Sequence, residues 1–205
     1  MLSKSQVKYI QSLGQKKRRD EEDIFIAEGP KLVEELLQEK IVVIKEIFAV
    51  KEWISANKSF LNKIPATEIT EPELDKISLL TTPHLVLAVA EKIKWPDSYN
   101  LDGTISLALD TIQDPGNFGT IIRIADWFGI NRIFCNKYSA DVYNPKCVQA
   151  SMGSIARVRL EYVELVDWLG ENKGIRTYAA TLDGRDIAKM EKINEHFRYR
   201  TTKKS

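Results

Sequence analysis

Apolar residues recur at helical spacing in the first half of the chain and alternate with short apolar runs. The helical pattern predicts three helices, over residues 3–13, 31–38 and 71–77. Thr70 and Glu73 have the spacing of a capping box at the start of the third helix. Runs rich in apolar and β-branched residues predict strands over residues 24–27, 41–50 and 85–90. This half is therefore predicted to be a small α/β unit.

Strands and helices alternate strictly in the second half. The predicted strands are residues 104–109, 132–135 and 175–181, and the predicted helices are residues 119–128 and 163–169. Such alternation implies parallel strands, with the connecting helices on both faces of the sheet. Ligands of parallel sheets bind at the carboxyl ends of the strands, in the loops that lead into helices. The loop from Asp110 to Arg123 is therefore the first place to look for a site.

A stretch of turn-forming residues separates the two halves. Lys92–Gly103 contains Pro96, Asp97 and Gly103 between two apolar runs, which is typical of an interdomain linker. We therefore predict one domain over residues 1–95, a second over residues 104–190 and a basic tail over residues 191–205.

Composition narrows the class of protein. The chain has 205 residues, of which 43% are hydrophobic and 29% are charged, and no apolar run is long enough to cross a membrane. We expect a globular cytoplasmic protein. Cys135 and Cys147 stand apart and are expected to be reduced packing residues, and His84 and His196 lie far apart in sequence. No metal site is expected.

Positive charge is concentrated near the N-terminus. Residues 1–19 contain six bases and no acid, and four of the bases are consecutive, namely Lys16, Lys17, Arg18 and Arg19. A cluster of this kind can bind an RNA backbone, because each phosphate that it neutralises releases counterions. Charge alone favours the simpler interpretation, a solvated helix face.

The loop after the strand at residues 104–109 has a readable local structure. Asp114-Pro-Gly predicts a turn, and Asn117 is expected to cap the following helix. The apolar positions predicted to face the sheet are Ile121, Ile122, Ala125 and Phe128. Arg123 then lies on another face, where it can hold a phosphate through two hydrogen bonds. A plain surface arginine is an equally good interpretation of the spacing.

The same loop carries a family resemblance. Asp114-Pro-Gly-Asn-Phe-Gly-Thr-Ile-Ile-Arg-Ile-Ala-Asp-Trp-Phe-Gly129 resembles the first signature motif of the SpoU/TrmH RNA 2′-O-ribose methyltransferases. The stretches Tyr143-Asn-Pro-Lys146 and Ala150-Ser-Met-Gly-Ser-Ile155 resemble the segment after that motif in the family. In the first half, Phe25-Ile-Ala-Glu-Gly-Pro-Lys-Leu-Val-Glu-Glu35 and Leu80-Thr-Thr-Pro-His-Leu-Val-Leu-Ala88 resemble the family's N-terminal substrate-binding domain. The resemblance runs from about Lys4 to about Met190.

The resemblance implies both a fold and an activity. It implies a small ribosomal-protein-like α/β RNA-binding domain, followed by a parallel-sheet domain of the SPOUT (trefoil-knot) type. It also implies a homodimer that moves a methyl group from S-adenosylmethionine to a ribose 2′-hydroxyl of rRNA or tRNA. Arg123 matches the family's catalytic arginine, and Asn117 matches the asparagine that shapes the site. With RNA as the implied substrate, the basic run at residues 16–19 is interpreted as an RNA contact.

The last part of the chain departs from the family pattern. The sequence contains neither a second motif of the Gly-Asn-Glu kind nor a third that ends in Ser-Leu-Asn, and residues 190–205 are polar and basic. Those motifs form the knot and surround the donor in the family, so the second domain is expected to be incomplete, from truncation, a frame change or divergence. The residues that would bind the cofactor stay unassigned, and the chain is expected to bind S-adenosylmethionine weakly or not at all. Two interpretations remain, a methyltransferase and a noncatalytic RNA-binding relative.

Overall fold

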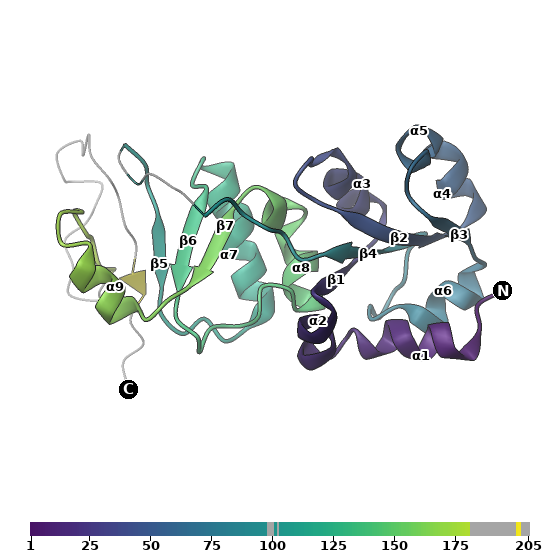
Figure 1. The fold of residues 1–205 in the computed structure, drawn as a ribbon, viewed down its shortest axis with the longest axis horizontal. Helices are drawn as coiled ribbons and strands as arrows, with labels where there is room; N and C mark the ends of the chain where they lie inside the picture. Colours follow the sequence, from purple (N-terminus) through teal and green to yellow (C-terminus); the bar gives the residue numbers. More distant parts are fainter. Residues whose placement is uncertain (98–100, 102, 181–199, 202–205) are drawn as a thin grey trace.

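The computed structural model describes residues 1–97, 101, 103–180 and 200–201. Within these residues the strands form two four-stranded sheets, which lie side by side along the long axis of the molecule (Figure 1). The strand order is β1-β4-β2-β3 in the first sheet and β7-β6-β5-β8 in the second. Each sheet belongs to one half of the chain, so the break between them falls where the linker is predicted.

The first sheet is mixed. Its strands are β1 (Ile24–Glu28), β2 (Ile44–Ala49), β3 (Ala66–Glu68) and β4 (Val86–Glu91). The helices around it are α1 (Lys4–Ser12), α2 (Lys16–Glu22), α3 (Pro30–Gln38), α4 (Lys51–Ala56), α5 (Lys58–Leu61) and α6 (Glu71–Ile77). The central strand β4 pairs antiparallel with β1 and β2, and β3 pairs parallel with β2. Buried side chains of α1 and α6 cover one face of the sheet, and those of α3 and α4 pack against the other.

The second sheet is parallel throughout, as predicted. Its strands are β5 (Leu107–Leu109), β6 (Arg132–Cys135), β7 (Arg159–Tyr162) and β8 (Arg200–Thr201). Its helices are α7 (Pro115–Trp127), α8 (Pro145–Ser151), α9 (Leu165–Glu171) and the short 3-10 helix η1 (Ser154–Ala156). Leu109 and Ile133 share a core with α7 and α8, whereas Phe134 stacks on Trp168 of α9, with 4.0 Å between ring centroids. The helices therefore cover both faces, and the predicted α/β class is confirmed.

Several predicted elements need correction. Helix α7 begins at Pro115 rather than at residue 119, because proline suits the first turn and Asp114, not Asn117, supplies the cap. The helix ends at Trp127, so Phe128 leaves the buried face and is 73% exposed. The strand predicted over 175–181 is not present at residues 175–179, and residue 181 lies outside the described part. Helix α2 is not among the helices predicted from apolar periodicity, because its sequence, KKRRDEE, contains no apolar residue.

The two sheets share one hydrophobic core. Buried residues of the first sheet, of α7 and α8 and of the second sheet form a single cluster, and α8 lies at the junction of the sheets (Figure 1). Arg157 adds ion pairs across the junction, to Glu35 at 3.2 Å and to Glu39 at 2.8 Å. The domain limits 1–95 and 104–190 stay predictions, and most of the predicted tail, residues 191–205, lies outside the described residues.

The sequence predicts neither a membrane span nor a metal site. Across residues 1–97, 101, 103–180 and 200–201, no helix is long and apolar enough to cross a membrane. The same residues contain no cluster of three or more histidine, cysteine or acidic side chains that could hold a metal ion.

Candidate active site

The carboxyl end of β5 contains a strained residue. Thr111 has φ +57°, a value that β-branched residues rarely adopt. Asn136, which follows β6, stabilises this turn: its side-chain oxygen accepts hydrogen bonds from the Thr111 amide at 3.2 Å and the Ser139 hydroxyl at 3.1 Å. Its side-chain amide donates to Asp110 and, at 2.9 Å, to the Thr111 hydroxyl. Strain of this kind is concentrated at functional sites, and here it lies at the strand ends where a ligand site is expected.

The polar side chains at these strand ends contact one another. Asp110, Thr111 and Asn136 are joined by hydrogen bonds, so much of their hydrogen-bonding capacity is used within the turn. The family's second and third motifs would fall after residue 180, and residues 181–199 lie outside the described part. The expected weakness of donor binding therefore stays a prediction.

The first turn of α7 is held by Asp114. Its carboxylate accepts a hydrogen bond from the Asn117 amide at 2.7 Å and an ion pair from Lys146, at the start of α8, at 3.0 Å. The bond from the Asn117 amide, followed by that from Lys146, lowers the pKa of Asp114 below its usual value. Asp114 is therefore ionised at neutral pH and connects the starts of two helices.

Helices α7 and α8 cross closely at Gly119. A Cβ atom at this position would lie 2.3 Å from the carbonyl oxygen of Cys147 and 2.7 Å from the Cβ of Ala150. Only glycine permits this approach, which explains the second glycine of the motif on packing grounds. Cys147 and Cys135 are fully buried, and burial raises the pKa of each thiol to about 12, so both are inert packing residues.

A hollow of about 660 Å³ opens between the two halves of the chain beside this crossing. Its walls come from the first turns of α7 and α8 and from residues 79–81 of the first half. The lining includes Asn117 and Thr120 of α7 and Lys146 and Gln149 of α8. The volume lies in the range of small-ligand pockets. The structure thus places Asn117 in a hollow lined by both halves, which was not predicted from the sequence.

Glu28 holds the first-half wall of this hollow. The carboxylate is 4% exposed, and it accepts hydrogen bonds from the Ser78 hydroxyl and, at 2.9 Å, from the Leu79 amide. Burial raises the pKa of Glu28, although both hydrogen bonds oppose the shift. Glu28 lies in the segment that resembles the family's substrate-binding domain, but no local pattern around it indicates this contact.

A pH titration tests the environment of Glu28. Its folded pKa lies above the ordinary value of 4.5, so the unfolded chain releases the proton first as the pH rises. Folded stability from this group is thus present below pH 4.5 and is lost as the pH rises through the folded pKa. We expect the unfolding free energy of the wild type to fall with pH relative to that of Glu28→Gln, measured by denaturant unfolding between about pH 4 and pH 7. A wild type that instead gains stability with pH relative to Glu28→Gln would show a carboxylate stabilised by folding.

Arg123 lies outside the hollow. It is exposed, and it is six residues after Asn117, about 9 Å further along the helix axis. Three exposed apolar side chains lie near it at the C-terminal end of α7, namely Ile124 (50% exposed), Trp127 (85%) and, just after the helix, Phe128 (73%). Within the described residues Arg123 has no ion-pair partner, so its guanidinium is available to a ligand. The structure therefore does not bring Arg123 and Asn117 into one cavity.

The basic run lies in the first part of helix α2, and its side chains have two kinds of environment. The side chains of Lys16, Lys17 and Arg18 are 63%, 85% and 54% exposed, and each pairs with an acid of the same helix. Arg19 is 1% exposed and pairs with Asp141 of the second half. The prediction that Arg19 contacts RNA is therefore wrong for this structure, because its guanidinium is buried.

Comparison with known proteins assigns both halves. Residues 104–201 match the SpoU rRNA Methylase family, and residues 4–88 match the MRM3-like substrate binding domain. The chain is 30% identical over 178 residues to the 23S rRNA (guanosine(2553)-2′-O)-methyltransferase RlmP of Bacillus subtilis, covering 86% of this chain and 70% of that protein. It is 28% identical to the mitochondrial rRNA methyltransferase 3 of Xenopus tropicalis, of which it spans 38%.

Solved structures share the fold over almost the whole chain. A TrmH-family protein from Porphyromonas gingivalis has 35% identity and a TM-score of 0.82, covering 97% of this chain and 80% of that one. The AdoMet-bound rRNA methyltransferase from Sinorhizobium meliloti has 29% identity and a TM-score of 0.82, covering 98% and 78%. The parallel sheet, the strained turn after β5 and the close crossing at Gly119 thus occur in a chain whose relatives modify RNA, and this chain belongs to the SpoU rRNA methylase family.

Proposed function

We propose that the protein transfers a methyl group from S-adenosylmethionine to a ribose 2′-hydroxyl of rRNA or tRNA. The observation that carries this proposal is the first turn of α7, which presents Asn117 to a hollow lined by both halves of the chain. The relative from Sinorhizobium meliloti binds AdoMet, which supports the choice of donor. We assign residues of the described part to contacts with the RNA substrate.

Arg123 and Asn117 suit the acceptor chemistry. A ribose hydroxyl is a very weak acid, so its oxygen becomes a good nucleophile only if the developing negative charge is stabilised or the proton is removed. Arginine stays protonated at any physiological pH, and its planar fork matches a phosphate. We therefore assign Arg123 to the phosphate and the developing alkoxide, and Asn117 to holding the nucleotide in line for attack.

Helix α2 is proposed as the main electrostatic contact with RNA. Replacing Lys16, Lys17 and Arg18 together by alanine should reduce the slope of log affinity against log salt by roughly 2–3 units, because each lost phosphate contact removes about 0.7–0.9. A matched control replaces Lys51, Lys58 and Lys63, which are exposed bases around α4 and α5. Filter binding of structured rRNA over a salt series measures both. Equal slopes in the two triple variants would mean that the bases of α2 do not contact RNA and form only a solvated helix face.

A second copy of the chain is proposed to cover the apolar face of α7. Ile124, Trp127 and Phe128 form an exposed apolar strip next to Arg123, and such strips commonly mark interfaces. A homodimer through this face would also bring a partner close to the site. We expect Trp127→Glu to give a monomer in sedimentation velocity, while Val43→Glu, a change at a 51% exposed position on the first half, stays dimeric. A monomeric wild type would contradict the proposal.

A second candidate function is RNA binding without methyl transfer. It is favoured by the exposed bases of α2, which can bind an RNA backbone without a methyl donor, and by the hydrogen bonds among Asp110, Thr111 and Asn136, which use much of the polar capacity at the ends of β5 and β6. Incubation with structured RNA and methyl-labelled donor, supplied in large excess to offset weak binding, separates the candidates. Label in the RNA supports methyl transfer. RNA binding without label supports the second candidate, and loss of both activities would overturn the RNA assignment.

A further inference from the structure

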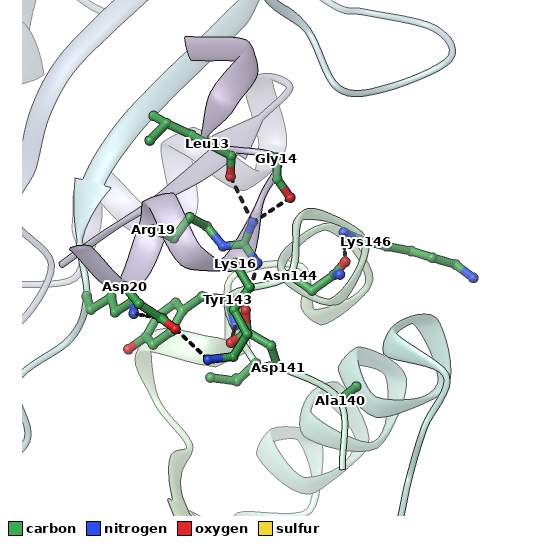
Figure 2. Close-up of polar contacts among 12 residues, drawn as sticks. Leu13, Gly14, Lys16, Arg19, Asp20, Ala140, Asp141, Tyr143, Asn144 and Lys146 are labelled. Atoms are coloured by element: carbon green, nitrogen blue, oxygen red, sulfur yellow. Dashed lines mark hydrogen bonds and ion pairs between the residues drawn. The ribbon is translucent and has the colours of Figure 1, made fainter. Parts of the chain in front are cut away.

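Arg19 joins the two halves of the chain. Its Nη1 donates to the carbonyl oxygens of Leu13 and Gly14, both at 2.8 Å, at the end of α1. Its Nη2 donates to the Oδ2 of Asp141 at 2.7 Å, across the junction (Figure 2). The Nε atom is buried, and no group among the described residues accepts a hydrogen bond from it. One guanidinium thus ties the α1–α2 turn to the loop before α8.

That loop is attached to the first half at a second point. The Oδ1 of Asp141 accepts a hydrogen bond from the Tyr143 amide at 3.0 Å, which fixes the Tyr143 backbone. The Tyr143 hydroxyl accepts one from the Ile93 amide at 2.9 Å, and its ring lies 5.1 Å from that of Phe25. Asp141 therefore orients a tyrosine that packs onto the first sheet.

The same loop leads directly to the candidate active site. The side chain of Asn144 accepts a hydrogen bond from the Lys146 amide at 2.9 Å and so begins α8. Lys146 then pairs with Asp114, the residue that caps α7 in front of Asn117. A short series of polar contacts, from Arg19 through Asp141 and the start of α8, thus ends at the first turn of α7.

Stability alone does not explain an arginine here. Burying an ion pair costs desolvation that the pairing offsets only in part, and apolar replacements of similar size are often as stable. Three acceptors from two segments instead match the fixed fork of a guanidinium, which lysine lacks. The preceding residues, Lys16, Lys17 and Arg18, point their side chains into solvent. Arg19 therefore connects α2, the helix proposed to bind RNA, to the loop that supports the site.

We propose that Arg19 is a positioning residue: its contact with Asp141 sets the distance and angle between the RNA-binding helix α2 and the first turns of α7 and α8. RNA held on α2 then delivers its target ribose to the hollow at the first turns of α7 and α8, which Asn117 lines. This inference rests on the proposed function for its consequence in catalysis, but the positioning itself can be measured without RNA.

Pulsed electron paramagnetic resonance, which measures the distance between two spin labels, tests whether Arg19 positions the two halves. Spin labels on cysteines introduced at Lys17 of α2 and Asp167 of α9, both exposed, report the distance between the halves. The native Cys135 and Cys147 are buried, with thiol pKa values raised to about 12, so they should not take up label. We expect one narrow distance distribution in the wild type, a broadened or shifted one in Arg19→Met and partial recovery in Arg19→Lys. Asp141→Asn, which keeps the size and the bond to Tyr143, should broaden it as well.

Measurements of RNA affinity and of the methyl-transfer rate are the second test of the proposal. Since Lys16, Lys17 and Arg18 stay in place, the affinity of the Arg19→Met protein for RNA should change less than twofold, whereas the rate of methyl transfer at saturating RNA should fall about tenfold. Unchanged distance distributions in both Arg19→Met and Asp141→Asn would overturn the inference, and so would a loss of RNA affinity that matches the loss of rate. If the wild type transfers no methyl group, the proposed function fails, and the distance measurement alone still decides whether Arg19 positions the halves.

Discussion

Gly119→Ala should destabilise the folded protein by about 3 kcal/mol or more, at the upper end of overpacking effects. The added methyl would lie 2.3 Å from the carbonyl oxygen of Cys147, a backbone atom that can move only if α8 moves with it. The modest gain in helix propensity of alanine over glycine, about 1 kcal/mol, is too small to offset this clash. Thermal unfolding should show a melting temperature lower by roughly 10 °C.

Gly116→Ala is the matched control, because it lies in the first turn of the same helix. A Cβ there would meet the Oδ1 of Asp114 and the Cε of Lys146, both at 3.0 Å, so these two side chains need to shift by only a few tenths of an ångström. We expect a change of less than about 1 kcal/mol. A Gly119→Ala protein as stable as the Gly116→Ala protein would contradict the close crossing of α7 and α8.

Arg123→Ala should abolish most of the methyl transfer while leaving the fold intact. The side chain is exposed and supports no packing, so the unfolding free energy should change by less than about 0.5 kcal/mol. Removing one group that stabilises developing negative charge typically lowers the rate about 100-fold. Steady-state methylation beside thermal melting measures both effects.

Arg123→Lys distinguishes charge from geometry at this position. Lysine keeps the positive charge but cannot form two parallel hydrogen bonds to a phosphate, so only part of the rate should return. A large fall in melting temperature in either variant would mean that Arg123 is structural. Full activity in Arg123→Ala would remove it from the site.

Local signals allowed much of the fold to be predicted. Helix α6 was predicted at Glu71–Ile77, and the capping box of Thr70 and Glu73 is present, because both partners lie within one turn. The parallel second sheet followed from the alternation of strands and helices. Helix α2 could not be found this way, since its seven residues are all charged and only Arg19 is buried.

The candidate site was only partly readable from the sequence. Asn117 and Arg123 came from the motif, and whether they act as proposed awaits the experiments above. The wall at residues 79–81 and its anchor Glu28 are about 50 residues apart in the chain, and no local pattern links them. Arg19 was misassigned for the same reason: its partner Asp141 is 122 residues away, so spacing alone made it one more base in a basic run.

The position of the transferred methyl group tests the central claim most directly. RNA that has been incubated with the protein and methyl-labelled S-adenosylmethionine is hydrolysed in alkali, which cleaves next to every free 2′-hydroxyl. A ribose 2′-O-methyl group removes the nucleophile for that cleavage, so we expect label in alkali-stable dinucleotides, and much less of it with Arg123→Ala. Label in single nucleotides would place the methyl group on a base, and it would contradict ribose methylation by this protein.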